Sequence, residues 1–241
     1  MSRLLISPQE PAIIRAMEEK GFDIVPTERI DCFLQPEQYH ADMQALVLGN
    51  RLFTLNDCVK KIGRDYPANV RLNCLLLGSR LYGKLSAVDD MVLDYCRENG
   101  IETVNVNQGY TRCSTLVAGD NAVITADRSI AEAMESNGVG VLLISAGHIR
   151  LEGFDYGFIG GCTCRVERTV YSFGNIKKHP DYEAIKAFLC ENDSFLEICC
   201  EEMPLTDIGG AVSLSSCVHG KADSSRLRFS SALSSGEYRS R

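Results

Sequence analysis

Charged residues recur at one position of a repeated segment, and they are the first candidates for chemistry. In four segments a charged residue stands seven places before a glycine, and a looser fifth copy begins at Asp207. Because charges are rarely buried without a partner, this recurrence before apolar stretches predicts a shared polar cavity in which the charges neutralise one another or a ligand. The alternative is that each side chain lies at the solvent-exposed rim of its sheet. The five candidate binding residues are Asp42, Arg71, Arg112, Arg150 and Asp207.

The arginines in this set indicate the class of ligand. A site built for a guanidinium group should be rich in carboxylates, whereas Arg71, Arg112 and Arg150 would hold carboxylate or phosphate groups through charge-assisted, two-pronged hydrogen bonds. Asp42 and Glu152 could bind the cationic end of a ligand that has one. We therefore expect a small anionic or zwitterionic ligand.

The cysteines offer few candidate nucleophiles or metal ligands. Cys113 follows Arg112, whose charge could lower the pKa of the thiol, but alternation along a strand predicts that the two side chains point to opposite faces. The chain has 11 cysteines without a Cys-x-x-Cys pair. Cys162-x-Cys164 alone does not complete a four-ligand zinc site. We therefore expect reduced core thiols, no metal and no cofactor.

The composition limits the class of protein. Apolar residues make up 45% and charged residues 24% of the chain, which is typical of a folded core. The formal net charge of -7 argues against a nucleic-acid-binding protein. The longest apolar stretch, residues 139–146, is far shorter than the roughly 20 residues of a membrane span, and the N-terminal residues do not resemble a signal peptide. We expect a cytoplasmic protein with a small-molecule ligand and no membrane or nucleic-acid partner.

The elements that must position the candidate residues are repeated along the chain. Three segments share a helix end, a glycine and then an apolar strand, with the glycines at Gly21, Gly100 and Gly138. A glycine just past a helix adopts the left-handed conformation that other side chains resist. Apolar spacing predicts helices over residues 8–20, 87–99, 129–137 and 180–190. Strands that run into tight turns are predicted from residues 42, 71, 112, 150 and 207.

These elements predict five helix-plus-hairpin units. One such unit cannot bury its apolar face alone, so tandem copies must pack on one another, and five that close into a ring leave few free edges. The predicted fold class is α/β, a five-unit α/β propeller with pseudo-fivefold symmetry. The alternative is an α/β sandwich in which helices and strands simply alternate. We expect one domain over residues 1–219 and a flexible, Ser/Arg-rich tail over 220–241.

Five such units in a chain of this length resemble the pentein superfamily of α/β propellers. That superfamily includes guanidine-modifying enzymes such as dimethylarginine dimethylaminohydrolase, the deiminases and the amidinotransferases, together with a non-catalytic ribosome anti-association factor. The resemblance covers residues 1 to about 218. In that fold the strand starts of all units face a central channel, which implies that the five charged residues surround a ligand there.

The resemblance also implies catalytic residues. His148-Ile149-Arg150, nine residues before Gly157, is similar to the segment that carries the catalytic histidine of the family hydrolases. An imidazole there is suited to general acid-base catalysis. His40 lies in a His-x-Asp segment similar to that of the deiminases. The family enzymes attack with a cysteine of the last unit, but Leu214 occupies the aligned position, and Cys217 could serve only in a displaced strand.

The sequence therefore predicts a divergent pentein-fold protein that binds a small polar molecule in its central channel without the usual cysteine nucleophile. Two alternatives stay open. One is a Cys/His-dependent amidinohydrolase or amidinotransferase acting on a guanidino compound, and the other is a non-catalytic interaction propeller. The catalytic candidates are His148, Glu152 and Cys217, and His40 joins the five charged residues as a binding candidate.

Overall fold

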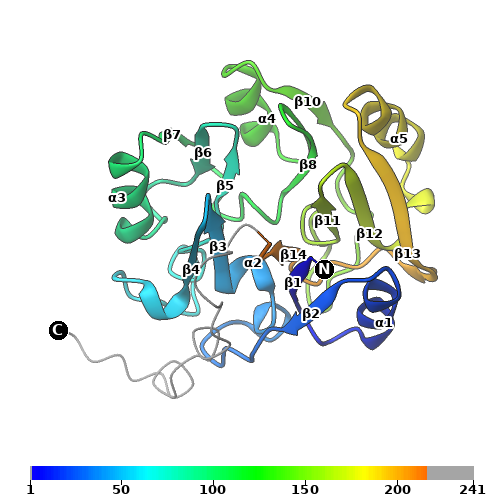
Figure 1. Ribbon diagram of the computed structural model, residues 1–241, viewed down its shortest axis with the longest axis horizontal. Helices are drawn as coiled ribbons and strands as arrows, with labels where there is room; N and C mark the ends of the chain where they lie inside the picture. Colours follow the sequence, from blue (N-terminus) through cyan, green and yellow to red (C-terminus); the bar gives the residue numbers. More distant parts are fainter. Residues whose placement is uncertain (1, 216–241) are drawn as a thin grey trace.

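Small β-sheets surround the middle of the molecule, and the longer helices lie toward its outside (Figure 1). The computed structural model describes residues 2–215, so Cys217 and the tail predicted over residues 220–241 lie outside the described residues. The described residues form five sheets, with the strand orders β14-β1-β2, β3-β4, β5-β6-β7, β10-β9-β8 and β11-β12-β13.

The strands are β1 (Arg3–Ile6), β2 (Asp23–Pro26), β3 (Ala45–Leu48), β4 (Arg51–Thr54), β5 (Leu75–Leu77), β6 (Arg80–Gly83), β7 (Glu102–Asn105), β8 (Thr115–Gly119), β9 (Ala122–Thr125), β10 (Gly140–Leu143), β11 (Thr163–Val166), β12 (Thr169–Asn175), β13 (Phe195–Pro204) and β14 (Ala211–Ser213). The α-helices are α1 (Pro11–Glu19), α2 (Ala41–Gln44), α3 (Asp90–Glu98), α4 (Arg128–Glu135) and α5 (Tyr182–Glu191). Short 3-10 helices are η1 (Gln35–Glu37), η2 (Leu55–Asp57) and η3 (Ile176–Lys178).

Three of the four three-stranded sheets share one order of elements along the chain. Two antiparallel strands form the first part, a helix follows, and a third strand then pairs in parallel with the second, as in β5-β6-α3-β7 and β8-β9-α4-β10. The first sheet joins distant parts of the chain, because β14 pairs antiparallel with β1 and places Ser213 opposite Leu4. The end of the described chain is therefore held to its beginning by backbone hydrogen bonds.

Local signals account for the ends of the helices. Asp89 and Asp127 cap α3 and α4, and their carboxylates accept hydrogen bonds from backbone N–H groups of the first turn. The glycines predicted to follow helices, Gly21, Gly100 and Gly138, have φ values of 88°, 67° and 77°, the left-handed conformation. The predicted glycine conformations are confirmed, because the end of a helix depends on the few residues around it.

The helices cover their sheets with narrow apolar faces. Ile13 and Met17 of α1 are fully buried and pack in the same cluster as Phe173 of β12. Ile130 and Met134 of α4 are likewise fully buried and pack with β-strand residues of neighbouring sheets. This packing fixes the outer side of each sheet, so that the loops at the strand starts are left to build the middle of the molecule.

All five predicted strand starts are corrected. Arg71, Arg112 and Asp207 lie in turns or loops, and the strands that follow them, β5, β8 and β14, begin only at Leu75, Thr115 and Ala211. Asp42 lies within the short helix α2 rather than on a strand, and β3 begins only at Ala45. Residues 151–157 form a loop, and the hairpin of that part of the chain is β11-β12. The physical reason is visible in the segment itself, since Glu152 to Tyr156 are all exposed and offer no alternating apolar face to a sheet.

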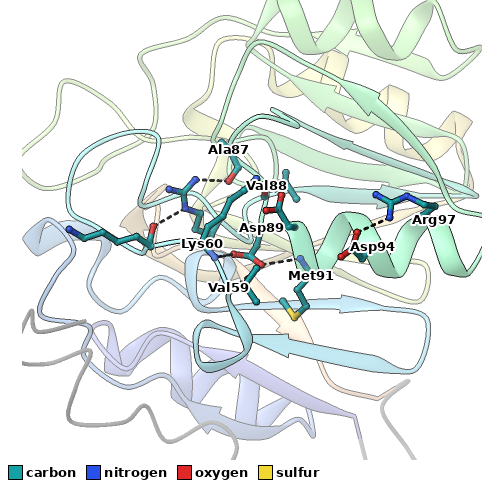
Figure 2. Close-up of polar contacts among 11 residues, drawn as sticks. Val59, Lys60, Ala87, Val88, Asp89, Met91, Asp94 and Arg97 are labelled. Atoms are coloured by element: carbon teal, nitrogen blue, oxygen red, sulfur yellow. Dashed lines mark hydrogen bonds and ion pairs between the residues drawn. The ribbon is translucent and has the colours of Figure 1, made fainter. Parts of the chain in front are cut away.

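Within residues 2–215 the β3-β4 sheet has no third strand, and the segment that follows β4 is held to α3 instead. Asp89 accepts hydrogen bonds from the backbone N–H groups of Val59, Lys60 and Met91 at 3.1, 2.7 and 3.1 Å (Figure 2). The Lys60 ammonium donates to the Val88 carbonyl at 2.7 Å. One buried carboxylate thus joins the loop after β4 to the start of the next helix.

Candidate functional site

A cluster of buried polar side chains lies where several loops meet. His40, Asp42, Asn73, Cys113 and Asp207 have exposed fractions of 3%, 2%, 1%, 2% and 4%. They come from the start of α2, the loops before β5 and β8, and the turn between β13 and β14. Polar groups are rarely buried together without a role in structure or function, so we call these five residues the central cluster and treat it as the first candidate site.

Asn73 holds the central cluster together. Its Oδ1 accepts hydrogen bonds from the backbone N–H groups of Arg112 and Cys113 at 2.8 and 3.2 Å. Its Nδ2 donates to the Cys113 sulfur at 3.0 Å and to the Asp42 carbonyl at 3.3 Å. The Cys113 thiol in turn donates to Oδ2 of Asp42 at 2.9 Å. The amide thereby fixes the thiol and the carboxylate relative to each other.

Burial governs the protonation of this cluster. Burial, reinforced by the nearby charge of Asp207, raises the pKa of Asp42 to about 6, although His40 and the hydrogen bond from Cys113 oppose the shift. Burial and the carboxylates of Asp42 and Asp207 raise the pKa of the Cys113 thiol well above its ordinary value. Because the thiolate is the nucleophilic form, Cys113 is not an activated nucleophile at neutral pH in this arrangement.

The turn around Asp207 is built from close backbone contacts. The Asp207 carboxylate accepts hydrogen bonds from the backbone N–H groups of Phe158 and Gly209, both at 2.9 Å. A Cβ placed on Gly161 would lie 2.0 Å from Oδ1 of Asp207, and one on Gly209 would lie 2.3 Å from the Cβ of His40. Glycine is therefore required at both positions for the turn to fit against the cluster.

A surface pocket of about 750 Å³ opens beside the same turn. This volume is within the range of pockets that hold small ligands. Side chains of both charges line it, and among the described residues none of Glu10, Arg64, Arg150 and Glu152 forms a side-chain hydrogen bond or ion pair. We call this the Asp207 pocket, and its polar lining residues are Gln9, Glu10, Gln35, Arg64, Arg150, Glu152, Thr206 and Asp207.

The structure brings some of the predicted residues together and separates others. Asp42, Asp207 and His40 share the central cluster, whereas Arg150 and Glu152 are exposed at the Asp207 pocket. The prediction that five charged side chains meet in one cavity is therefore corrected.

The arginines show why the single cavity does not form. Arg71 donates to the carbonyl groups of Lys61 and Ala87, both at 3.0 Å, and so braces the loop after β4. The guanidinium of Arg112 donates to the carbonyl of Thr115 at 3.3 Å and lines a different pocket, of about 340 Å³, with Arg165. Burying three guanidinium groups together is costly. The long side chains of Arg71 and Arg112 reach backbone carbonyl groups instead, and Arg150 is exposed.

The predicted catalytic histidine lies away from the central cluster. His148 is exposed, and its ring meets the ring of His179 edge-on with 5.3 Å between the ring centres. Leu214, which the resemblance to the pentein enzymes implies at the position of their nucleophile, is only 3% exposed and packs with Leu5, Ala41 and Ala45. Of the predicted catalytic residues, Glu152 thus lines the Asp207 pocket, His148 does not, and Cys217 lies outside the described residues.

Sequence reasoning missed Asn73 and set Cys113 aside. Both stand close to recurrent charged positions, since Asn73 is two residues after Arg71 and Cys113 directly follows Arg112. Inspecting the residues next to each recurrent charged position would have singled out Asn73 and Cys113. The sequence analysis also missed Glu37. This side chain is 4% exposed and accepts hydrogen bonds from the Tyr110 hydroxyl at 2.8 Å and from Asn69 at 3.1 Å.

Comparison with solved structures identifies the fold. Dimethylarginine dimethylaminohydrolase from Pseudomonas aeruginosa, a mutant complexed with citrulline, matches with a TM-score of 0.53 and 11% identity over 88% of this chain and 98% of the other. Agmatine deiminase of C. jejuni matches with a TM-score of 0.51 and 9% identity over 88% and 93% of the two chains. At this identity the likeness shows the fold alone, which is the mixed α/β fold of the pentein superfamily.

The sequence comparisons identify the family of the chain. A search of curated protein sequences gave no match. Within the described residues, no helix combines the length and the apolar character needed to cross a bilayer. Residues 48–212 match one protein family, and this segment includes Asn73, Cys113 and Asp207. The chain therefore belongs to the family DUF6873, which is described as a family of unknown function.

Proposed function

We propose that this protein binds a small zwitterionic molecule in the Asp207 pocket and does not turn it over. The observation that carries the proposal is the lining of that pocket, where Arg64 and Arg150 can hold a carboxylate and Glu10 and Glu152 can hold a cationic group. These side chains have no hydrogen-bond or ion-pair partners within residues 2–215, so a ligand does not have to displace existing contacts. Charge-assisted hydrogen bonds of this kind give both affinity and orientation.

The arrangement of thiols favours binding over catalysis. The Cys113 thiol is buried, bonded to Asp42 and protonated at neutral pH, because its pKa is raised well above the ordinary value. Leu214 is a buried apolar side chain where the family enzymes would carry the attacking cysteine. Neither residue supplies the thiolate that attack on a guanidinium carbon requires.

The fold supports the same class of ligand. One structural relative is complexed with citrulline, a zwitterionic amino acid. We also propose that the five sheets are the five blades of an α/β propeller, with the β14-β1 pair closing the ring. The shared order of elements in three of the four three-stranded sheets and the arrangement of the sheets in Figure 1 support this interpretation.

Calorimetric titration of the full chain with L-citrulline, L-arginine and agmatine tests the proposal. We expect L-citrulline or L-arginine to bind with one site per chain. Agmatine, which lacks the carboxylate, should bind at least about tenfold more weakly. Arg150→Ala should weaken binding by about tenfold, whereas Arg128→Ala, an exposed arginine of α4 outside the pocket, should leave it unchanged.

The same samples distinguish the alternatives. No binding of either amino acid, or equal binding by the Arg150→Ala variant, would contradict the proposed pocket. Release of ammonia, an amine or citrulline from a guanidino compound by the wild-type chain would instead identify an amidinohydrolase. Covalent labelling of a cysteine by a haloacetamidine would point to that enzyme as well, and peptide mapping would name the cysteine.

A further inference from the structure

The central cluster contains three side chains of the kinds that bind transition metals. One ligand atom each from His40, Asp42 and Cys113 lies within 4.8 Å of the other two. His40 and Asp42 come from the start of α2, and Cys113 lies 71 residues further along the chain, before β8. A nitrogen, an oxygen and a sulfur ligand are thus brought together by the fold.

The two buried carboxylates of the central cluster, Asp42 and Asp207, would be stabilised by a cation. Asp42 and Asp207 are both buried, and within residues 2–215 no lysine or arginine forms a hydrogen bond or an ion pair with either carboxylate. Oδ1 of Asp42 is buried and has no hydrogen-bond partner among the described residues. A buried acceptor left without a partner is uncommon and needs an explanation, such as an ion that occupies the free lone pairs.

We propose that His40, Asp42 and Cys113 form a binding site for one divalent transition-metal ion of the Zn²⁺ type. Zinc ligands lie about 2.0–2.3 Å from the metal, so neighbouring ligand atoms of a tetrahedral site are roughly 3.5 Å apart. The Cys113 sulfur lies 2.9 Å from Oδ2 of Asp42, and the three ligand atoms lie within 4.8 Å of one another, a range that includes this spacing. Asp207 lies beside both sites, but none of His40, Asp42 and Cys113 lines the Asp207 pocket, and neither proposal depends on the other.

The kind of ligands selects the kind of metal. Imidazole and thiolate ligands suit zinc and its neighbours among the transition metals, whereas Ca²⁺ and Mg²⁺ prefer oxygen ligands alone. In the metal-free protein the Cys113 thiol donates its proton in a hydrogen bond to Oδ2 of Asp42. When the metal binds, the sulfur becomes a thiolate ligand and this proton is released to solvent. Three protein ligands leave a fourth position for Asp207 or a water molecule.

The surroundings of the three side chains are suited to holding such an ion. Asn73 donates a hydrogen bond to the Cys113 sulfur and accepts one from the backbone N–H of Cys113, and together these bonds orient the thiol. Gly209 packs directly against His40, where any Cβ would collide with the histidine. Groups that orient metal ligands in this way raise metal affinity, so Asn73 is a positioning residue of the proposed site.

Refolding the full chain with metal tests the proposal. The wild-type protein is unfolded with chelator and reductant, refolded with Zn²⁺ or Co²⁺, and desalted, and its metal content is measured by mass spectrometry. We expect one metal per chain and, with Co²⁺, the near-ultraviolet charge-transfer band of a cobalt-thiolate bond. A wild-type chain that retains no metal, or one that binds Co²⁺ without this band, overturns the proposal.

Single variants assign the ligands. Cys113→Ser should abolish the thiolate band and weaken Zn²⁺ binding about 100-fold or more in competition with a chromophoric chelator. His40→Gln and Asp42→Asn should weaken Zn²⁺ binding but retain the thiolate band. These two variants test the site if Cys113→Ser does not fold. The controls are Cys164→Ser, a buried thiol outside the cluster, and Cys190→Ser, an exposed one. If the band depends on Cys190, or survives in Cys113→Ser, the metal lies elsewhere and the proposal is wrong.

Discussion

The Cys113 thiol donates a hydrogen bond to Oδ2 of Asp42 across 2.9 Å, and this bond ties the loop before β8 to the helix α2. Both side chains are buried, so water cannot replace either partner. The bond therefore couples the stability of the fold to the protonation of a carboxylate, and it places a buried thiol next to a buried histidine and a buried acid.

Removing the thiol should expose this coupling. Cys113→Ala leaves Oδ2 of Asp42 without its donor, and we expect it to lower the free energy of unfolding by about 1–3 kcal/mol. Cys113→Ser retains a donor of similar size and should cost less. Urea unfolding in the presence of a chelator measures both. Equal losses for the two variants would show that packing, rather than the hydrogen bond, determines the effect.

The protonation of Asp42 should make stability depend on pH. Its pKa is raised from 3.8 to about 6 in the folded state, so the folded chain binds this proton more tightly than the unfolded chain does. The contribution of Asp42 to stability is therefore complete below pH about 4 and is lost as pH rises through about 6.

The variant Asp42→Asn removes this titration. Relative to wild type, it should be more stable at pH 7.5 than at pH 4 by about 2–3 kcal/mol, measured by urea unfolding with chelator present. Asp120→Asn, whose side chain is 99% exposed, should follow the wild-type profile. A difference between Asp42→Asn and wild type that does not change with pH would contradict the raised pKa.

Gly209 should tolerate no side chain. It has a φ of 79°, and a Cβ would lie 2.3 Å from the Cβ of His40, so Gly209→Ala combines backbone strain with a collision. We expect a loss of about 3 kcal/mol or more. Gly138→Ala is the matched control, because its φ of 77° is nearly the same while the space beside it is open. It should cost only about 1 kcal/mol, and similar losses at the two sites would rule out the collision.

Asp89 should contribute more to stability than its neighbouring charges. Its carboxylate accepts three backbone hydrogen bonds in Figure 2, and Asp89→Ala should cost about 3 kcal/mol and accelerate amide exchange at Val59 and Lys60. Asp94→Asn removes an exposed ion pair with Arg97 on the same helix and should cost about 0.5 kcal/mol or less. A loss at Asp89 no larger than that at Asp94 would contradict the pinning role.

Patterns within a few residues were sufficient to predict much of the secondary structure. The helix that ends before Gly100 and the hairpin turn at Gly78 were read correctly, because the left-handed glycine conformation is a local property. The apolar Leu214 was also informative, since no arrangement of the chain gives it a nucleophilic atom. The loop over residues 151–157 was misread, because a spacing to a glycine does not by itself create an apolar face.

The contents of the central cluster depended on contacts between distant residues. Equivalent positions in the chain predicted that Arg71 and Asp42 would share a cavity, yet Arg71 reaches two loop carbonyls while Asp42 meets Cys113. The length and flexibility of an arginine let packing choose its partner, and a short aspartate has no such freedom. Residue types and their order were thus enough to predict the class of fold and the absence of a thiol at Leu214. Long-range packing determined which side chains meet around Asp42. The reason is that a buried polar group is stable only where it finds a partner.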